Sequence, residues 1–204
     1  MNISKLLVNK LEETLDHFSQ NELAYLALTS KIEMPIRDKV AFQIQKELNS
    51  EGFIASREWI YDRKRCDLAI LNQDHPIALI EFKAMYHFDV LLNNSRPNKF
   101  ETEIEKDVQK SKNISWPKTK IFEVLLSTNP KRQIKKQLKG IVKYYSDINR
   151  SLRKVDSPQI IDEEVNLRVN NWYKDHTVET GLIKCGESLN IPTELRYWVI
   201  GPFN

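Results

Sequence analysis

The sequence contains few cysteines and no long apolar run near its start. Cys66 and Cys185 are the two cysteines in 204 residues, so we expect neither a disulfide framework nor a cysteine-based zinc site. No His-x-x-His or Cys-x-x-Cys spacing occurs, which makes zinc a poor candidate altogether. Residues 1–18 alternate charged and apolar side chains. We therefore predict no signal peptide, no membrane span and a reducing cytoplasm as the compartment.

The composition is that of a globular protein of ordinary size. Hydrophobic residues make up 41% of the chain and charged residues 29%, which leaves enough apolar side chains for a real core. The sequence shows no internal repeat, no low-complexity tract and no linker. We therefore predict a single domain over residues 1–204.

The net charge of +3 hides an uneven distribution. Residues 131–154 contain nine basic residues and one acid, so this stretch alone carries a charge of +8 and the rest of the chain sums to −5. Such segregation is typical of a protein that touches a polyanion with one face.

Two short apolar runs separated by a polar turn form the centre of the sequence. Residues 66–71 (CDLAIL) and 77–84 (IALIEFKA) flank the turn cluster 72–76 (NQDHP), a pattern that predicts a β-hairpin. Counting outward from the turn gives these pairs: Leu71 with Ile77, Ile70 with Ala78, Ala69 with Leu79, Leu68 with Ile80, and Asp67 with Glu81.

Both faces of this hairpin are apolar, as in the middle of a covered sheet. Side chains alternate along a strand, so one face is predicted to carry Cys66, Leu68, Ile70, Ala78, Ile80, Phe82 and Ala84, and the other Ala69, Leu71, Ile77 and Leu79. Asp67, Glu81 and Lys83 are then charges at the rim of a buried sheet, where charges need partners or a metal. Carboxylates opposite each other repel, and a hard cation such as Mg²⁺, which takes oxygen ligands, would relieve that repulsion.

These residues carry a family resemblance. Asp67, followed after a short turn by Glu81-Phe82-Lys83 at the end of an apolar strand, resembles the core of the restriction-endonuclease-like, or PD-(D/E)XK, nuclease superfamily. The proline that often precedes the aspartate in that family is Cys66 here. The resemblance covers residues 33 to about 128 and does not extend to the last third of the chain.

The resemblance implies a metal-dependent endonuclease. Asp67, Glu81 and the backbone carbonyl of Phe82 would hold one or two Mg²⁺ ions, with Mn²⁺ as a substitute, and Lys83 would orient the attacking water and stabilise the transition state. The implied product carries a 5′-phosphate. DNA is the implied substrate, in restriction, anti-phage defence or DNA processing, and RNA stays an alternative.

A helix over about residues 35–50 is predicted to contribute one more acid. Its apolar stripe, Ile36, Val40, Ile44 and Leu48, continues back to Glu33 if the first turn extends that far. By resemblance, a glutamate on this helix completes the metal site, and Glu33 is the matching position. The alternative is a glutamate favoured only by the helix dipole. Asp38 and Glu47 are weaker candidates.

A basic amphipathic helix is predicted to begin at Pro130. Its outward lysines are Lys131, Lys135, Lys136, Lys139 and Lys143. A solvated lysine face is the commonest explanation for such a run. In a chain with a phosphodiesterase-like site, contact with nucleic-acid phosphates is comparably favoured.

The remaining pattern predicts an α/β fold with a central mixed β-sheet of four to six strands flanked by helices. By resemblance this is a restriction-endonuclease-like core with N-terminal helices and a C-terminal helical extension. The other predicted elements are helices over 4–18, 22–30, 101–112 and 158–174 and strands over 53–61, 121–128 and 195–200. His87 is predicted in a loop, either exposed or active in proton transfer or phosphate contact. Trp172, Tyr173 and Trp198 either stack on bases or belong to the core.

A rival interpretation keeps the fold without the chemistry. In it, Asp67, Glu81, Lys83 and Arg65 neutralise one another as an ion-pair cluster, and the chain is a non-catalytic nucleic-acid-binding or structural subunit. Cutting both strands of a duplex needs two active sites, so the nuclease interpretation also predicts a homodimer.

Overall fold

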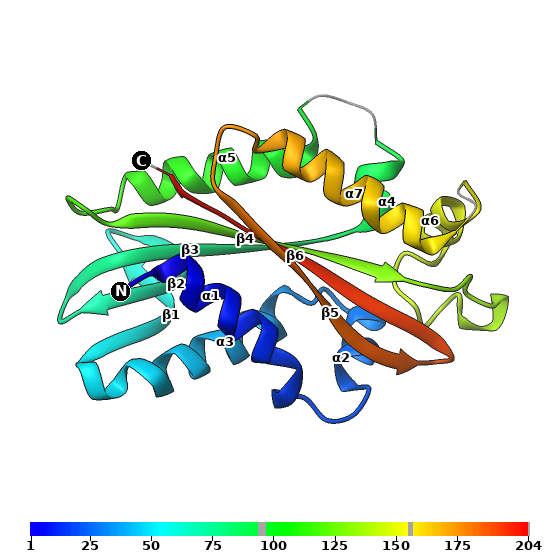
Figure 1. The fold of residues 1–204 in the computed structure, drawn as a ribbon, viewed down its shortest axis with the longest axis horizontal. Coiled ribbons are helices and arrows are strands. Elements are labelled where there is room, and N and C mark those ends of the chain that lie inside the picture. Colours follow the sequence, from blue (N-terminus) through cyan, green and yellow to red (C-terminus); the bar gives the residue numbers. More distant parts are fainter. Residues whose placement is uncertain (94–96, 155–156, 204) are drawn as a thin grey trace.

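The computed structural model describes residues 1–93, 97–154 and 157–203. It has an α/β fold in which helices cover both faces of a six-stranded sheet (Figure 1). The strand order is β1-β2-β3-β4-β6-β5, with β3 and β4 parallel and every other neighbouring pair antiparallel. The predicted fold class, with its mixed sheet of four to six strands, is confirmed. The strands are β1 (Phe53–Tyr61), β2 (Lys64–Asn72), β3 (His75–Tyr86), β4 (Lys120–Pro130), β5 (Val178–Ser188) and β6 (Ile191–Phe203).

The helices form two layers. Helices α1 to α3 pack their apolar side chains on one face of the sheet and α4 to α7 on the other (Figure 1). No helix among the described residues is both long and apolar enough to cross a membrane. The α-helices are α1 (Ile3–Glu12), α2 (Glu22–Thr29), α3 (Glu33–Leu48), α4 (His87–Leu91), α5 (Lys99–Lys112), α6 (Tyr145–Leu152) and α7 (Pro158–Trp172), and 3₁₀ helices span Glu13–His17, Asn49–Glu51 and Lys136–Leu138.

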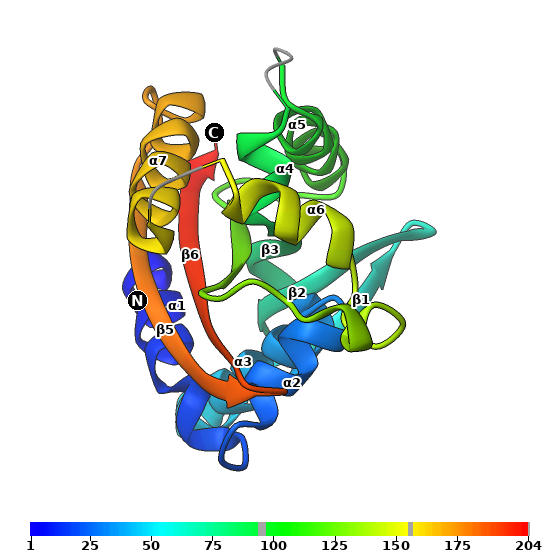
Figure 2. The same cartoon turned by 90° about the vertical axis from the view of Figure 1, so that its right-hand side faces the viewer.

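The sheet is strongly twisted, as strands of L-residues require. Figure 2 shows β5 and β6 turned well away from the direction of the β1–β2 hairpin. In this sheet β3 and β4 are the two central strands, and both helix layers cover them.

The predicted hairpin is confirmed over its middle and corrected at both ends. Leu68 pairs with Ile80, Ala69 with Leu79 and Ile70 with Ala78, as predicted. Beyond Ile70 a register shift pairs Leu71 with Pro76 instead of Ile77, which shortens the turn. At the other end pairing stops at Leu68, and Cys66 joins the apolar cluster of Ala69 and Leu71 rather than that of Leu68.

The last third of the chain adds more sheet than the sequence predicted. Helices α6 and α7 are followed by the hairpin β5–β6, whose second strand pairs with β4. Only the strand over 195–200 was predicted. β5 is an edge strand with many exposed residues, and Gly181 lies against the ring of Tyr197, where a Cβ would collide with the phenol.

The predicted basic helix beginning at Pro130 is wrong. β4 runs to Pro130, and residues 131–144, all of them described, form one short 3₁₀ helix and no α-helix. The side chain of Asn149 accepts a hydrogen bond from the Ile134 N–H (2.7 Å) and donates one to its carbonyl (2.9 Å). These bonds satisfy the backbone groups that a helix would have paired internally.

Candidate active site

The predicted aspartate lies where β2 separates from β3. Beyond the Leu68–Ile80 pair the edge of β3 is free of β2, and Asp67 Oδ2 accepts a hydrogen bond from the Phe82 N–H at 2.9 Å. A residue in a strand directs its N–H and its carbonyl to the same side. The Phe82 carbonyl, predicted as a metal ligand, therefore faces the same opening as the Asp67 carboxylate.

Glu33 joins this opening from the first turn of α3. Its carboxylate lies close enough to Asp67, Lys83 and the Ala84 backbone for all three to influence its pKa. Asp67 thus bonds to the free edge of β3 at Phe82, and Glu33 lies near the same edge at Ala84. The helix begins at Glu33 rather than at Pro35, which is what allows Glu33 to reach the strand.

Arg37, one turn further along α3, fixes Asp67 from the α3 side. Its guanidinium lies 3.3 Å from Asp67 Oδ1 and 3.0 Å from Asp38 Oδ1, and it also pairs with Glu58. Glu58 adopts a left-handed backbone conformation (φ 51°) in the middle of β1, which is uncommon for a residue with a side chain. Arg37 was not among the site residues predicted from the sequence, where nothing but its position one turn after Glu33 marks it.

Glu81 and Lys83 form ion pairs with α5, which belongs to the other helix layer. Lys110 Nζ on α5 lies 2.6 Å from Glu81 Oε1. Asp107, one turn earlier on the same helix, lies 2.5 Å from Lys83 Nζ and 3.2 Å from Lys110 Nζ. An ion-pair cluster does form, as the rival interpretation predicts, but with Lys110 and Asp107 as partners, whereas Arg65 pairs with Glu58.

One further acid on β4 belongs to this region. Glu123 pairs in register with Glu81 across the parallel β3–β4 ladder and is fully buried. Neither of its carboxylate oxygens has a hydrogen-bond partner among the described residues. Burial, with the charge of Glu81 adding to it, raises the pKa of Glu123 well above its ordinary value. A glutamate within the apolar run IFEVLLST was the available sequence signal.

The acids of the site repel one another. Burial raises the pKa of Glu81 to about 7, and the negative charge of Asp67 adds to the rise while Lys110 opposes it. Burial also raises the pKa of Glu33, again with a contribution from Asp67. A group of acids held in this state is one that a bound cation would stabilise.

The donors predicted to hold Mg²⁺ are Asp67, Glu81 and the Phe82 carbonyl. Among the described residues, no group of three His, Cys, Asp or Glu side chains is arranged to hold a metal ion. Mg²⁺ commonly binds one or two carboxylates and keeps several waters, so Asp67, Glu81 and the Phe82 carbonyl are a sufficient set of oxygen donors. Lys110 contacts one of these carboxylates and Arg37 the other.

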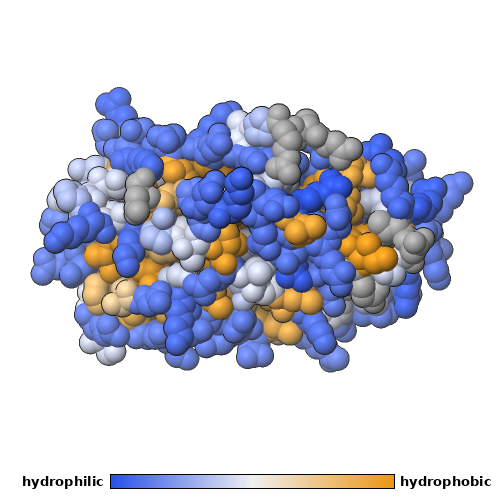
Figure 3. All heavy atoms as spheres, turned by 45° about the horizontal axis from the view of Figure 1, so that its top comes forward, coloured by the Kyte–Doolittle hydropathy of each residue, from blue (hydrophilic) through white to orange (hydrophobic). Residues whose placement is uncertain are grey.

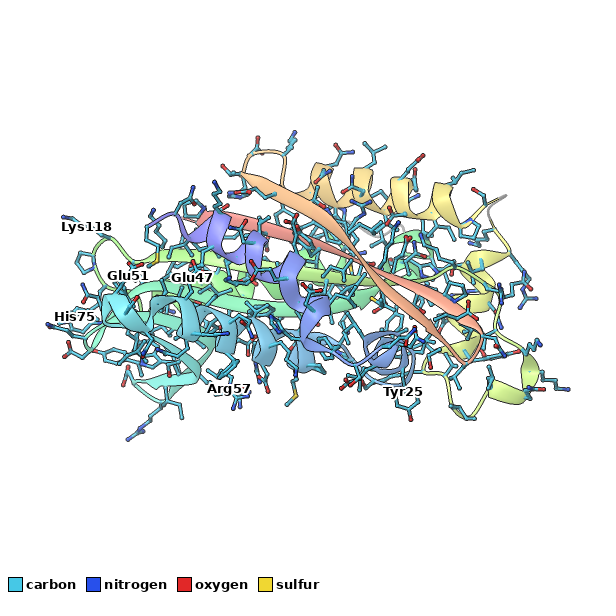
Figure 4. All side chains as sticks on the ribbon, turned by 60° about the horizontal axis from the view of Figure 1, so that its bottom comes forward. Tyr25, Glu47, Glu51, Arg57, His75 and Lys118 are labelled. Atoms are coloured by element: carbon cyan, nitrogen blue, oxygen red, sulfur yellow. The ribbon has the colours of Figure 1, made fainter. Side chains whose placement is uncertain are left out.

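The weaker candidates lie in structural contacts. Asp38 pairs with Arg57 (2.5 Å), which points away from the body of the molecule (Figure 4), and Glu47 pairs with Lys10 (2.7 Å). His87 is neither in a loop nor exposed. It lies on α4, fully buried, 2.6 Å from Ser151 Oγ and 3.3 Å from the Thr128 carbonyl.

Of the three aromatic residues considered for base stacking, Tyr173 and Trp198 are buried in the core and Trp172 is half-buried beside it.

The five lysines predicted to contact nucleic acid do not share one helix face. Lys131 pairs with Glu194 at 2.5 Å, and Lys143 Nζ lies 5.3 Å from the centre of the Tyr144 ring. The segment lies beside α2, where the Lys143 N–H donates to the Leu28 carbonyl (Figure 2). Three of the five are exposed: Lys135, Lys136 and Lys139.

No protein-family model matches the chain, and neither the curated proteins nor the solved structures contain a significant match.

Proposed function

We propose that this chain is a metal-dependent endonuclease that hydrolyses phosphodiester bonds in DNA. The observation that carries the proposal is the gathering of Asp67, Glu33 and the Phe82 backbone at the free edge of β3, with Glu81 and Lys83 on the same strand. These residues match the resemblance noted in the sequence, position by position.

Asp67, Glu81 and the Phe82 carbonyl would hold Mg²⁺ or Mn²⁺. Bound there, the ion supplies positive charge to the scissile phosphate and acidifies a nearby water. Arg37 keeps Asp67 oriented through its fixed guanidinium. Glu33 would add a further ligand to the ion through a water.

Lys83 is the residue assigned to the attacking water and to the charge that develops on the phosphate. Its ammonium is held at Asp107 (2.5 Å), which keeps it positively charged and limits its movement. A positive charge prearranged in this way stabilises the transition state without reorganisation during the reaction. The product is proposed to carry a 5′-phosphate, and cleavage of both strands is proposed to use two copies of the chain.

The test compares cleavage of plasmid and of single-stranded oligonucleotides in Mg²⁺, Mn²⁺ or EDTA. We expect cleavage by the wild type with either metal and none in EDTA. Lys83→Ala and Glu81→Ala are expected to lower the rate by about 10²–10³-fold. Lys46→Ala, which removes an exposed lysine from the outer side of α3, serves as the matched control and keeps the wild-type rate.

The same experiment separates the rival function. Arg37 and Lys110 already neutralise the two carboxylates, an observation that favours a non-catalytic nucleic-acid-binding or structural subunit. Retained DNA binding without cutting in any metal would support that rival. Cutting that survives both site substitutions at full rate would remove these residues from the proposal.

A further inference from the structure

An open groove runs along α5 next to the candidate site. It has a volume of about 540 Å³ and lies between the start of β2 and the outer side of α5. Much of the surface seen with α5 turned forward is hydrophilic (Figure 3). The groove is lined by Lys64, Lys106, Lys110, Gln109, Asn113 and Glu105, among others. Three lysines and two amides against one acid are the donors that bind the phosphates of a nucleic-acid strand.

Lys110 connects this groove to the metal-binding carboxylate. It lines the groove with its side chain 31% exposed, and its ammonium also lies 2.6 Å from Oε1 of Glu81, whose side chain is 3% exposed. Asp107, at 3.2 Å, gives the same ammonium a second anchor. Lys110 can therefore turn toward the groove while Asp107 keeps it nearby.

The Glu81 carboxylate cannot bind the Lys110 ammonium and a divalent metal ion favourably at the same time. An ammonium at hydrogen-bond distance and a divalent ion on the same buried carboxylate repel each other strongly where water does not screen them. Arg37 poses a different case, because its side chain is 5% exposed, three acids hold it, and it does not line the groove. Lys110 is thus the residue placed to exchange.

We propose that Lys110 couples substrate binding to metal binding by exchanging partners. In the free protein Lys110 neutralises Glu81. When a phosphodiester strand lies in the groove, Lys110 turns to a phosphate and leaves Glu81 to the divalent cation. The inference rests on the proposed nuclease function and adds its regulation: the metal binds weakly until nucleic acid arrives, and each ligand raises the affinity of the protein for the other.

The test uses Lys110→Met, with Lys106→Met as the matched control from the same groove and helix. Isothermal titration of Mn²⁺ into each full-length protein, without nucleic acid, measures the metal affinity. Fluorescence anisotropy of a labelled DNA duplex in Ca²⁺ measures the DNA affinity. Lys110→Met is expected to bind Mn²⁺ about 5-fold or more tightly than the wild type and to bind DNA more weakly. Lys106→Met is expected to lose DNA affinity with its Mn²⁺ affinity unchanged.

A second measurement tests the coupling between DNA binding and metal binding directly. The gain in Mn²⁺ affinity when the duplex is added is measured for wild type and for Lys106→Met, and both are expected to gain more than Lys110→Met gains. Thermal melting of all three proteins confirms that they are folded.

The outcomes separate this inference from the nuclease proposal. Mn²⁺ affinity that is unchanged or lower in Lys110→Met overturns the exchange, even if the wild type cleaves DNA. A rise in Mn²⁺ affinity together with weaker DNA binding supports the exchange, even if no cleavage is found and the nuclease proposal fails. Equal effects of the Lys106 and Lys110 substitutions on Mn²⁺ overturn it as well, since Lys106 does not contact Glu81.

Discussion

Two buried polar regions of this protein are held in opposite ways. At the candidate site the buried groups are ionisable, and two of the carboxylates pair with a cation from another element: Asp67 with Arg37 of α3 and Glu81 with Lys110 of α5. Glu123 beside them has no partner among the described residues. At the far end of β4 the buried groups are neutral: the His87 ring between the Thr128 carbonyl and the Ser151 hydroxyl, and the Asn149 amide on Ile134.

This difference indicates which of the two regions serves the stability of the fold and which is the better candidate for a functional site. Neutral groups that bond to backbone and hydroxyl partners satisfy the fold and leave nothing for a ligand. Buried charges are costly, and apolar residues of similar size commonly serve stability as well or better. A region that keeps several ionisable side chains together next to a groove is therefore the better candidate for chemistry. The turn between β2 and β3, marked by His75, and the loop before β4, marked by Lys118, lie together at one end of the molecule (Figure 4) and carry no such cluster of buried charges.

The largest effect should come from removing the cation that the charged region cannot replace. Arg37→Ala leaves Asp67 and Glu58 without their buried partner, and we expect a loss of about 3–5 kcal/mol in the free energy of unfolding. Urea denaturation monitored by circular dichroism measures it. Arg57→Ala, which removes an exposed arginine that pairs with Asp38, is the control and should cost at most about 1 kcal/mol. Equal losses in the two variants would show that the charged region is not held by Arg37.

The neutral region should make the stability of the protein depend on pH. Burial lowers the pKa of His87 to about 4, against 6.5 in an unfolded chain. Between these values the unfolded state binds the proton and the native state does not, so stability falls as the pH drops from about 6.5 to 4, by up to ~3 kcal/mol from this group. We expect His87→Gln to be less stable than the wild type at pH 7.5, and the gap to narrow toward pH 4.5. A gap that stays constant across this range would mean that the pKa of His87 is the same in the folded protein as in the unfolded chain.

The hairpin could be predicted because neighbouring residues in the sequence determine it. Apolar alternation and the turn cluster fix which residues of β2 and β3 can pair, and the pairs from Leu68–Ile80 to Ile70–Ala78 are those predicted. The predicted ladder continued to a pair between Asp67 and Glu81, whereas in the structure the pairing of β2 with β3 ends at Leu68 and Ile80. The Phe82 N–H bonds to the Asp67 side chain instead, a competition between side chain and backbone that no periodicity reveals.

The errors came from contacts distant in sequence. The basic stretch after Pro130 has helical spacing, but Asn149 takes the backbone groups of Ile134, so tertiary contacts override the pattern. β5 was missed because an edge strand exposes much of its length. Asp107 lies on the buried face of α5 with Ile104 and Val108, yet nothing in the sequence joins it to Lys83. The strands were thus easier to predict than the partners of the site residues.

The smallest expected effect comes from comparing two serines, one in each region. Both lie on helices and both are fully buried. Ser111 on α5, in the same helix as Lys110, has no hydrogen-bond partner for its hydroxyl among the described residues. Ser151 Oγ on α6 lies 2.6 Å from His87 Nε2 and 2.8 Å from the Ile148 carbonyl, which also accepts from the serine hydroxyl. Since the Thr128 carbonyl at Nδ1 can only accept, Nδ1 carries the proton of the neutral imidazole, and the Ser151 hydroxyl is the donor shared between Nε2 and the Ile148 carbonyl. Ser151→Ala should therefore cost about 1–2 kcal/mol by leaving the buried Nε2 of His87 without its hydroxyl partner, whereas Ser111→Ala should be neutral or stabilise by up to ~0.5 kcal/mol through helix propensity. Urea denaturation of the two variants side by side gives the difference. A loss at Ser111 as large as that at Ser151 would mean that its hydroxyl bonds within the charged region after all, and that α5 is held to β3 by more than its two ion pairs.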